Sequence, residues 1–440
     1  MRGRGKAAVL LGCVALMGGL VGACGDDSDS GGGGGSTSSD SGGESANAKV
    51  IDPASMDGAK GEITYCQGKD TAGNAKALIE GFNQKFQSQG ITAKLVEFPA
   101  DAGQQRAQFV QRQEAKSGEC DVFSSDVIWT AEFASQGWLY DLTPYIEDRR
   151  DDFIQPAIDT ATYEGKIWGV PHYTNAALLY YRKDKIDQAP ATWQEVYQQA
   201  GSNGGIVFQG AAYEGLTCDW LEIAYAAGGS VLSDDGKKAT IDSPENVAAT
   251  KLMADAVKSG AAPKAVATYM EPESLTAWQT GKPAMMRNWP YAYGLSQDTP
   301  KLKGKFDVAP LPSFEGAGKA AILGGGNNVV SVYSKNPGGA LAVVDFLAQQ
   351  EWQTQLTAEF SQASPLKGTY DQAEVKKAIP FSDDLLTALE QAKPRPVSPV
   401  YPQISQAIYK NVNRAISGQQ SPEDAMKQAQ SDIEKALSTF

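Results

Sequence analysis

The sequence predicts an α/β protein in which helices cover a parallel sheet, with two lobes of ordinary size. Segments typical of strands alternate with segments whose apolar residues recur at helical spacing, beginning near residue 63. The chain has 440 residues, which is long for one domain. Its formal net charge of −13 argues against a nucleic-acid partner, whose phosphates require clustered Lys and Arg.

The N-terminal segment, residues 1–23, reads as a secretory signal peptide. Three basic residues precede an apolar stretch at residues 7–21, which is shorter than the roughly 20 residues of a membrane span. Small residues stand directly before Cys24, and this pattern resembles the bacterial lipobox, which implies cleavage before Cys24 and lipidation of its thiol. An ordinary signal peptide with an incidental cysteine is the alternative.

A flexible tether is expected at residues 24–49, because this stretch is rich in Gly, Ser and Asp and cannot bury enough apolar surface to fold. Loss of residues 1–23 removes three positive charges, so the formal charge falls from −13 to −16. No later segment is long and apolar enough to span a bilayer. We therefore expect a folded domain that is held at the outer face of the cell membrane by its lipid alone.

The first half of the folded part follows a β-α-β-α-β order. Strands are expected at residues 63–66, 92–98 and 121–126, with helices at residues 75–86 and 104–116 and another from about residue 128. In such sheets ligands bind at the carboxyl ends of the strands, where residues 65–70 and 124–126 lie.

A second α/β unit begins near residue 176. Strands are expected at residues 177–181, 205–209, 283–286, 306–309 and 329–332, and the glycine-rich residues 324–328 are expected to form a flexible crossing. Helices are expected at residues 193–200, 216–227, 244–258, 272–280, 339–349, 384–391, 404–416 and 422–437. Ser421 followed by Pro422 and two acids is a strong helix start.

Cysteine and histidine counts restrict the chemistry. Once the signal and lipid-site cysteines are set aside, Cys66, Cys120 and Cys218 remain. An oxidising exterior permits one disulfide among them, and the odd count leaves at least one free thiol. His172 is the single histidine, so we expect no His-rich metal site, and nothing calls for a cofactor.

Several ordered motifs give the chain a family resemblance. They are DVFSSDVIWTAEFASQGW at 121–138, LLYYRKD at 178–184, YEGLTCDWLEIAYAAGGS at 213–230, RNWPYAYGL at 287–295, VAPLP at 308–312 and RPVSPVYPQ at 395–403. The chain resembles the family 1 extracellular solute-binding proteins of carbohydrate ABC importers, and most closely the trehalose/maltose-binding members.

This resemblance implies a two-lobed, periplasmic-binding-protein-like fold of type II, with discontinuous lobes, a hinge and a ligand in the interlobe cleft. The N-terminal lobe would comprise residues 50–174 and 327–368, and the C-terminal lobe residues 175–326 and 369–440. It also implies a monomer without enzymatic activity that delivers a disaccharide such as trehalose or maltose to the permease subunits.

Sugar recognition requires polar groups for the hydroxyls and aromatic planes for the ring faces. On the resemblance, the expected ligand-binding residues are Asp126, Tyr173, Asn175, Glu214, Trp289, Tyr291, Gly324, Gly325 and Arg395, with Asp70 as a further candidate from the cleft loop.

Each candidate also has a structural interpretation. Asp126 suits the N-cap of the following helix, and the charge of Glu214 suits a helix N-terminus. Asn175 could be a polar hinge residue, Arg395 an interlobe salt bridge, and the two glycines a hinge with permissive backbone. The two aromatic residues at 289 and 291 could belong to the core.

Two positions depart from the family pattern. Relatives often carry a bulky apolar residue where this chain has Gly326, so we expect an open pocket wall there. Some carry an arginine near the position of Gln105, whereas this chain has its arginine one position later, at Arg106. Two other functions remain as alternatives: a receptor for another solute, such as a polyamine or peptide, and a secreted glycosidase that uses two carboxylates such as Asp126 and Glu214.

Overall fold

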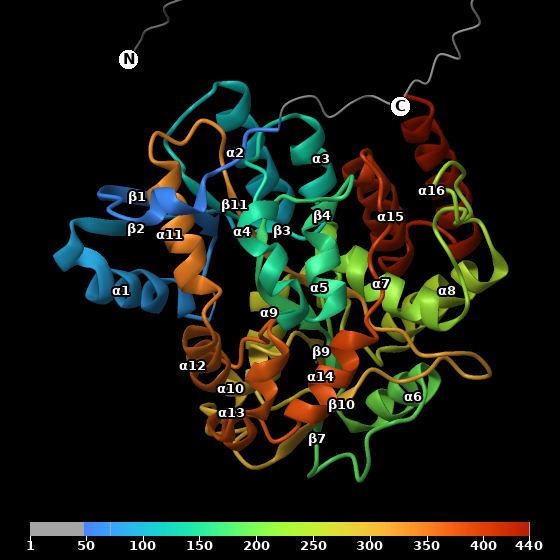
Figure 1. Ribbon diagram of the computed structural model, residues 1–440. Helices are drawn as coiled ribbons and strands as arrows, with labels where there is room; N and C mark the ends of the chain where they lie inside the picture. The colour runs from blue at the N-terminus through green and yellow to red at the C-terminus, as the bar shows by residue number, and fades with distance from the viewer. Residues whose placement is uncertain (1–47, 71, 440) are drawn as a thin grey trace, which may run out of the picture. The chain divides into compact units, whose positions relative to one another are not determined.

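The computed structural model describes residues 48–70 and 72–439 (Figure 1). The expected signal peptide, the lipidation of Cys24 and nearly all of the tether lie outside these residues and stay predictions. No helix in the described ranges is long and apolar enough to cross a membrane.

The first lobe is built on a five-stranded sheet with the order β2-β1-β3-β11-β6. β1 runs parallel to β2 and β3, as the β-α-β-α-β order predicted, but β11 is antiparallel to both of its neighbours. The parallel pairing predicted for the first three strands is therefore confirmed, but the whole sheet is mixed, because a strand from late in the chain enters it in the reverse direction. The strands are β1 (Gly61–Gly68), β2 (Ile91–Phe98), β3 (Val122–Asp126), β6 (Val170–Ala176) and β11 (Leu323–Val330).

Helices of the first lobe form where apolar residues recur at helical spacing. In α1, Ala75, Leu78 and Phe82 are buried on one face, and Figure 1 shows α1 and α11 beside β1 and β2. These helices are α1 (Asn74–Phe86), α2 (Ala102–Glu114), α3 (Thr130–Ser135), α4 (Thr143–Ile146), α5 (Gln155–Thr160), α11 (Pro337–Leu347) and α12 (Gln350–Phe360), with a small hairpin of β4 (Thr162–Tyr163) and β5 (Lys166–Ile167).

The second lobe contains a four-stranded sheet with the order β10-β7-β9-β8. Only β8 and β9 pair in parallel, and β7 is antiparallel to both β9 and β10. The strands are β7 (Leu178–Arg182), β8 (Ile206–Val207), β9 (Met285–Asn288) and β10 (Phe306–Pro310).

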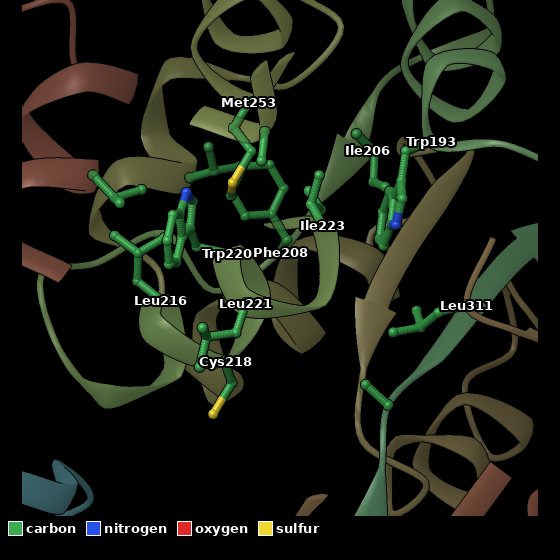
Figure 2. Packing of buried hydrophobic residues seen from close by; sticks show 14 of the residues in the cluster. Trp193, Ile206, Phe208, Leu216, Cys218, Trp220, Leu221, Ile223, Met253 and Leu311 are labelled. Carbon is green, nitrogen blue, oxygen red and sulfur yellow. The ribbon is translucent and has the colours of Figure 1, made fainter. Parts of the chain in front are cut away.

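The core of the second lobe contains fully buried tryptophans, among them Trp193 and Trp220 (Figure 2). C-terminal helices pack against helices from the middle of the chain, α15 against both α7 and α8. The helices of this lobe are α6 (Trp193–Asn203), α7 (Glu214–Ala226), α8 (Pro244–Ser259), α9 (Glu271–Gln279), α10 (Ala292–Gln297), α15 (Tyr401–Ile416) and α16 (Pro422–Leu437). Of the two remaining helices, α13 (Ala373–Ala378) packs against α12, and α14 (Ser382–Glu390) contacts both β6 and β10. Short 3-10 helices lie at Pro53–Met56, Gln87–Gln89, Glu147–Asp152, Lys264–Thr268 and Lys367–Asp371.

The last helix begins as its sequence predicted. The Ser421 side chain accepts a hydrogen bond from the Asp424 backbone N–H at 3.1 Å, and Pro422 is the first helical residue. This cap satisfies a backbone donor that the helix itself leaves unpaired.

Two strands carry the chain toward the boundary between the lobes. β6 leads through Ala177 directly into β7 of the other sheet, and β11 pairs with β6 in the reverse direction. The glycine-rich segment that was expected to be a flexible crossing lies inside β11, so that expectation is wrong. A Cβ at Gly325, whose φ is +131°, would lie 2.5 Å from the Tyr173 carbonyl oxygen. Glycine is required here for close packing within a strand rather than for flexibility.

A disulfide joins Cys66 in β1 to Cys120, just before β3, and leaves Cys218 as a buried free thiol. The sequence permitted one disulfide and left its partners open. The bond closes a loop with a sequence separation of 54 residues and ties together the two strands whose ends reach the cleft described below.

We predict that replacing both Cys66 and Cys120 by Ala lowers the free energy of unfolding by about 2–4 kcal/mol, because the unfolded chain regains the freedom of the closed loop. Urea unfolding of the variant measures this change. Reduced wild-type protein is the control and should match the variant. Equal stability of the variant and the oxidised wild type would contradict the prediction.

Candidate functional site

A cleft of about 250 Å³ lies between the two lobes, and all ten predicted ligand-binding residues line it. Asp126 comes from the end of β3, Asn175 from β6, Glu214 from the start of α7, and Trp289 from the residue after β9. The structure thus brings together residues that are widely separated in the sequence. Their roles as ligands remain predictions.

Arg395 connects the two lobes across this cleft. Its Nη2 donates to Asp126 Oδ1 at 2.7 Å, and its Nη1 donates to Glu214 Oε1 at 2.9 Å. The Arg395 side chain is only 3% exposed, so these charge-assisted bonds are shielded from water. Its Nε is also buried and has no hydrogen-bond partner among the described residues. The interlobe salt bridge considered for Arg395 is therefore present.

Glu214 is the most constrained acid in the cleft. Besides Arg395, the hydroxyls of Tyr401 and Ser405 in α15 donate to its two carboxylate oxygens. Burial raises the pKa of Glu214, and the nearby guanidinium opposes that rise. Three side chains donate to this carboxylate, which can accept about four hydrogen bonds, so one acceptor site remains for a ligand hydroxyl.

Asp126 also has part of the N-cap role that was considered for it. Its Oδ1 accepts from the Ile128 backbone N–H at 3.2 Å, although α3 begins later, at Thr130. The same carboxylate therefore shapes the turn after β3 and pairs with Arg395.

Trp289 is held at both its backbone and its ring. The Tyr180 hydroxyl donates to the Trp289 carbonyl at 2.7 Å, and the indole Nε1 donates to Glu271 Oε1 at 3.3 Å. The residue is 9% exposed, and Tyr291 lines the cleft beside it. An aromatic ring held in this way can serve as a flat surface for a sugar ring.

Asn175 lies opposite Trp289, with Gly324 between them. A Cβ at Gly324 would lie 3.3 Å from both Asn175 Cβ and the Trp289 ring, so the absence of a side chain lets these two groups approach each other. Within the described part of the chain, no hydrogen bond satisfies the Asn175 side-chain amide. This amide is therefore free to donate to and accept from a ligand.

Asp70 has different partners from those expected of a ligand. Its Oδ1 accepts from the backbone N–H groups of Ala72 and Gly73, and its Oδ2 accepts from that of Ala75 at 2.7 Å. These bonds cap the start of α1. Asp70 lines the cleft, but both of its carboxylate oxygens already accept hydrogen bonds from backbone N–H groups.

The two departures from the family pattern have structural explanations. Gln105 lines the cleft, whereas Arg106 pairs with Glu132 and does not line it. A Cβ at Gly326 would lie 2.6 Å from the Tyr173 ring. The expected opening at Gly326 is therefore wrong, because the Tyr173 ring fills that space.

Glu271 and Tyr213 are among the cleft residues that the sequence analysis did not name as ligands. The Tyr213 hydroxyl donates to Glu271 Oε2 at 2.7 Å. Tyr213 directly precedes Glu214 in the sequence, which was a usable signal. Glu271 is the first residue of α9, and nothing in its local sequence distinguishes it from an acid that stabilises a helix N-terminus.

His172 lines the cleft from β6 and is 4% exposed. Its ring lies edge-on to Tyr65 and Tyr173, with centroids 6.4 Å and 5.2 Å away. Its buried Nδ1 has no hydrogen-bond partner among the described residues. Burial lowers the pKa of His172 from 6.5 to about 4, so the native state keeps this ring neutral.

Comparison with known proteins places the chain among transport receptors. Residues 68–354 match the family model for the bacterial extracellular solute-binding protein. A probable ABC transporter-binding protein of Deinococcus radiodurans is 35% identical over 359 residues, which are 77% of this chain and 85% of that protein.

Solved structures give the same picture. Maltose-bound MalE3 of T. maritima has a TM-score of 0.81 at 35% identity, over 85% of this chain and 99% of that one. The GacH receptor of Streptomyces glaucescens, solved unliganded and with acarbose, has a TM-score of 0.78 at 26% identity, over 87% and 99%. The type II two-lobed fold expected from the sequence is confirmed.

We predict that acid destabilises the protein through His172. Its native pKa of about 4 lies below the unfolded value, so unfolding takes up a proton between pH 6.5 and pH 4 and stability falls as the pH falls through that window. The loss is about 2–3 kcal/mol near pH 4 to 5. His172→Phe keeps a buried ring without the proton, so its unfolding free energy should change less between pH 7 and pH 4.5. An identical pH dependence in both proteins would exclude this role.

Proposed function

Because this chain belongs to the bacterial extracellular solute-binding proteins, which serve ABC importers and are not enzymes, we propose that it captures a disaccharide such as maltose or trehalose and delivers it to its permease. The chain acts as a receptor and leaves its ligand chemically unchanged.

The observation that carries this proposal is the composition of the cleft. One lobe contributes Asp126 and Asn175, and the other contributes Glu214 and Trp289. Carboxylate and amide groups suit sugar hydroxyls, and an indole face suits the C–H surface of a sugar ring. A ligand that touches all four groups holds the two lobes together.

The relatives support a sugar ligand. MalE3 was solved with maltose and the GacH receptor with acarbose, and both are above 25% identity to this chain. The amide of Asn175, which has no partner among the described residues, offers both a donor and an acceptor to a sugar hydroxyl.

The same features weigh against the alternatives. In a glycosidase, two carboxyl groups flank the scissile bond, whereas here Arg395 lies between Asp126 and Glu214 and binds both. A polyamine would need acids free of a cation, and these two acids already share one.

The lobes are proposed to close around the ligand about the strands that link them, β6 and β11. A ligand that contacts both lobes favours the closed state by its extra contacts there. The predicted lobe boundaries after residues 174, 326 and 368 stay predictions, and Asn175, which follows the first of them, lies in β6 of the first lobe's sheet.

Attachment to the membrane is also part of the proposal. Lipidation at Cys24 and a tether through residue 49 would keep a monomeric receptor at the outer surface, near its permease. Mass spectrometry of the mature N-terminus tests this directly.

We predict that one disaccharide raises the melting temperature of the chain purified without residues 1–24. A ligand that binds only the folded protein stabilises it by about 2.7 kcal/mol at a hundredfold excess over its Kd. The screen comprises maltose, trehalose, sucrose, maltotriose, several monosaccharides and spermidine. A shift with spermidine alone would replace the sugar by a polyamine, and no shift with any sugar would reject the proposal.

We predict that Trp289→Ala lowers the affinity for that sugar roughly thirtyfold, since truncation of a central aromatic contact costs about 2 kcal/mol. Asn175→Ala should lower it about two- to tenfold, because one neutral hydrogen bond is lost. Isothermal titration calorimetry measures both. Trp138→Ala is the matched control, because Trp138 does not line the cleft. Near-normal affinity of the Trp289 variant would rule out stacking on this ring.

A further inference from the structure

The guanidinium group of Arg287 lies against the ring of Trp289, with its central carbon 4.0 Å from the ring centroid. Arg287 is 1% exposed and does not line the cleft, whereas Trp289 does. The cation therefore covers the ring face that is turned into the lobe. The opposite face is the one that remains for a ligand.

Three side chains fix the guanidinium group in place. Glu222 accepts from Arg287 Nε at 2.8 Å and also from Nη2. Gln209 Oε1 accepts from Nη1 at 2.8 Å, and Asp219 pairs with the same nitrogen at 2.9 Å. A planar group that is bound along two of its edges cannot rotate or slide without breaking several buried bonds.

Stability alone does not account for this cluster. Two acidic side chains share one guanidinium in a buried site, and burial raises the pKa of Asp219 well above its usual range. Buried ionic clusters of this kind can often be replaced by packed apolar residues without loss of stability. An apolar side chain would not, however, present a flat, oriented cation to an aromatic face.

We infer that Arg287 is a positioning residue for sugar binding, which fixes the plane of the Trp289 ring before the ligand arrives. Glu271 holds the edge of the ring through the indole N–H, and Arg287 holds its face. A ring that is already oriented loses less conformational freedom on binding, so its contact contributes more to affinity. This inference rests on the proposed function, in which Trp289 is the surface that meets the sugar.

A double-mutant cycle with calorimetry on maltose and on trehalose tests the inference. Arg287→Lys keeps the positive charge for Asp219 and Glu222 but removes the planar group. We expect it to weaken sugar binding about three- to tenfold and to reduce the sugar-induced change in tryptophan fluorescence. In a Trp289→Leu background, which keeps an apolar surface, the same substitution should change affinity less than about twofold.

Arg182→Lys is the matched control. Arg182 is also buried in the second lobe, where it pairs with Asp184 and with the Gly281 carbonyl, but it does not line the cleft or touch Trp289. We expect this variant to lose stability without losing affinity.

Two results would overturn the inference. One is wild-type affinity in Arg287→Lys, and the other is an equal loss of affinity in the wild-type and Trp289→Leu backgrounds. If Arg287→Lys does not fold, Glu222→Gln is the second variant, because it weakens the ion pair that fixes the Arg287 guanidinium. The same losses of affinity are expected in the two backgrounds. Failure of the wild-type protein to bind either sugar would instead count against the proposed function, and the inference would fall with it.

Discussion

The cleft depends on one cation, the Arg395 guanidinium, which binds a carboxylate from each lobe. Asp126 and Glu214 would repel each other across the cleft without this cation, because both lie within 3 Å of the same guanidinium and are partly shielded from water. With the cation between them, two acids can line a site for a neutral ligand. The arrangement also joins three distant segments of the chain, so the site exists only when β3, α7 and the loop before α15 are all in place.

The helix α7 links this ion pair to the aromatic side of the cleft. Glu214, Cys218 and Glu222 are spaced four residues apart, so they lie along one face of the helix. Glu214 meets Arg395 at the first turn, and Glu222 meets Arg287 two turns later. Figure 2 shows the Cys218 side chain pointing away from Trp220 and Met253. One rigid element thereby sets the spacing between the acid that faces the cleft and the cation behind Trp289.

In the first lobe, three glycines let β11 pack closely against β6 at the cleft. Gly324, Gly325 and Gly326 in β11 allow Asn175, the Tyr173 backbone and the Tyr173 ring to approach the strand more closely than any side chain would permit. As a result, the side chains of Tyr173 and Asn175 in β6 form this wall of the cleft. No side chain of Gly324 separates Asn175 from Trp289 of the second lobe. The same glycines explain why this segment is a strand although its composition suggested a flexible crossing.

The sequence alone determined the fold class and most helices, because periodic burial and local motifs such as the Ser421 cap are written in short stretches of chain. The family resemblance supplied ten residues that line the cleft, but not Glu271 or Tyr213. The family motifs carried Asp126, Glu214, Trp289 and Arg395 as a set. What only the tertiary structure decided are the relations between distant residues: the Cys66–Cys120 pairing, the reversed direction of β11, the sharing of Arg395 between two acids, and the contact of Arg287 with Trp289. These depend on how separate segments meet in space, and no local pattern of residues contains that information.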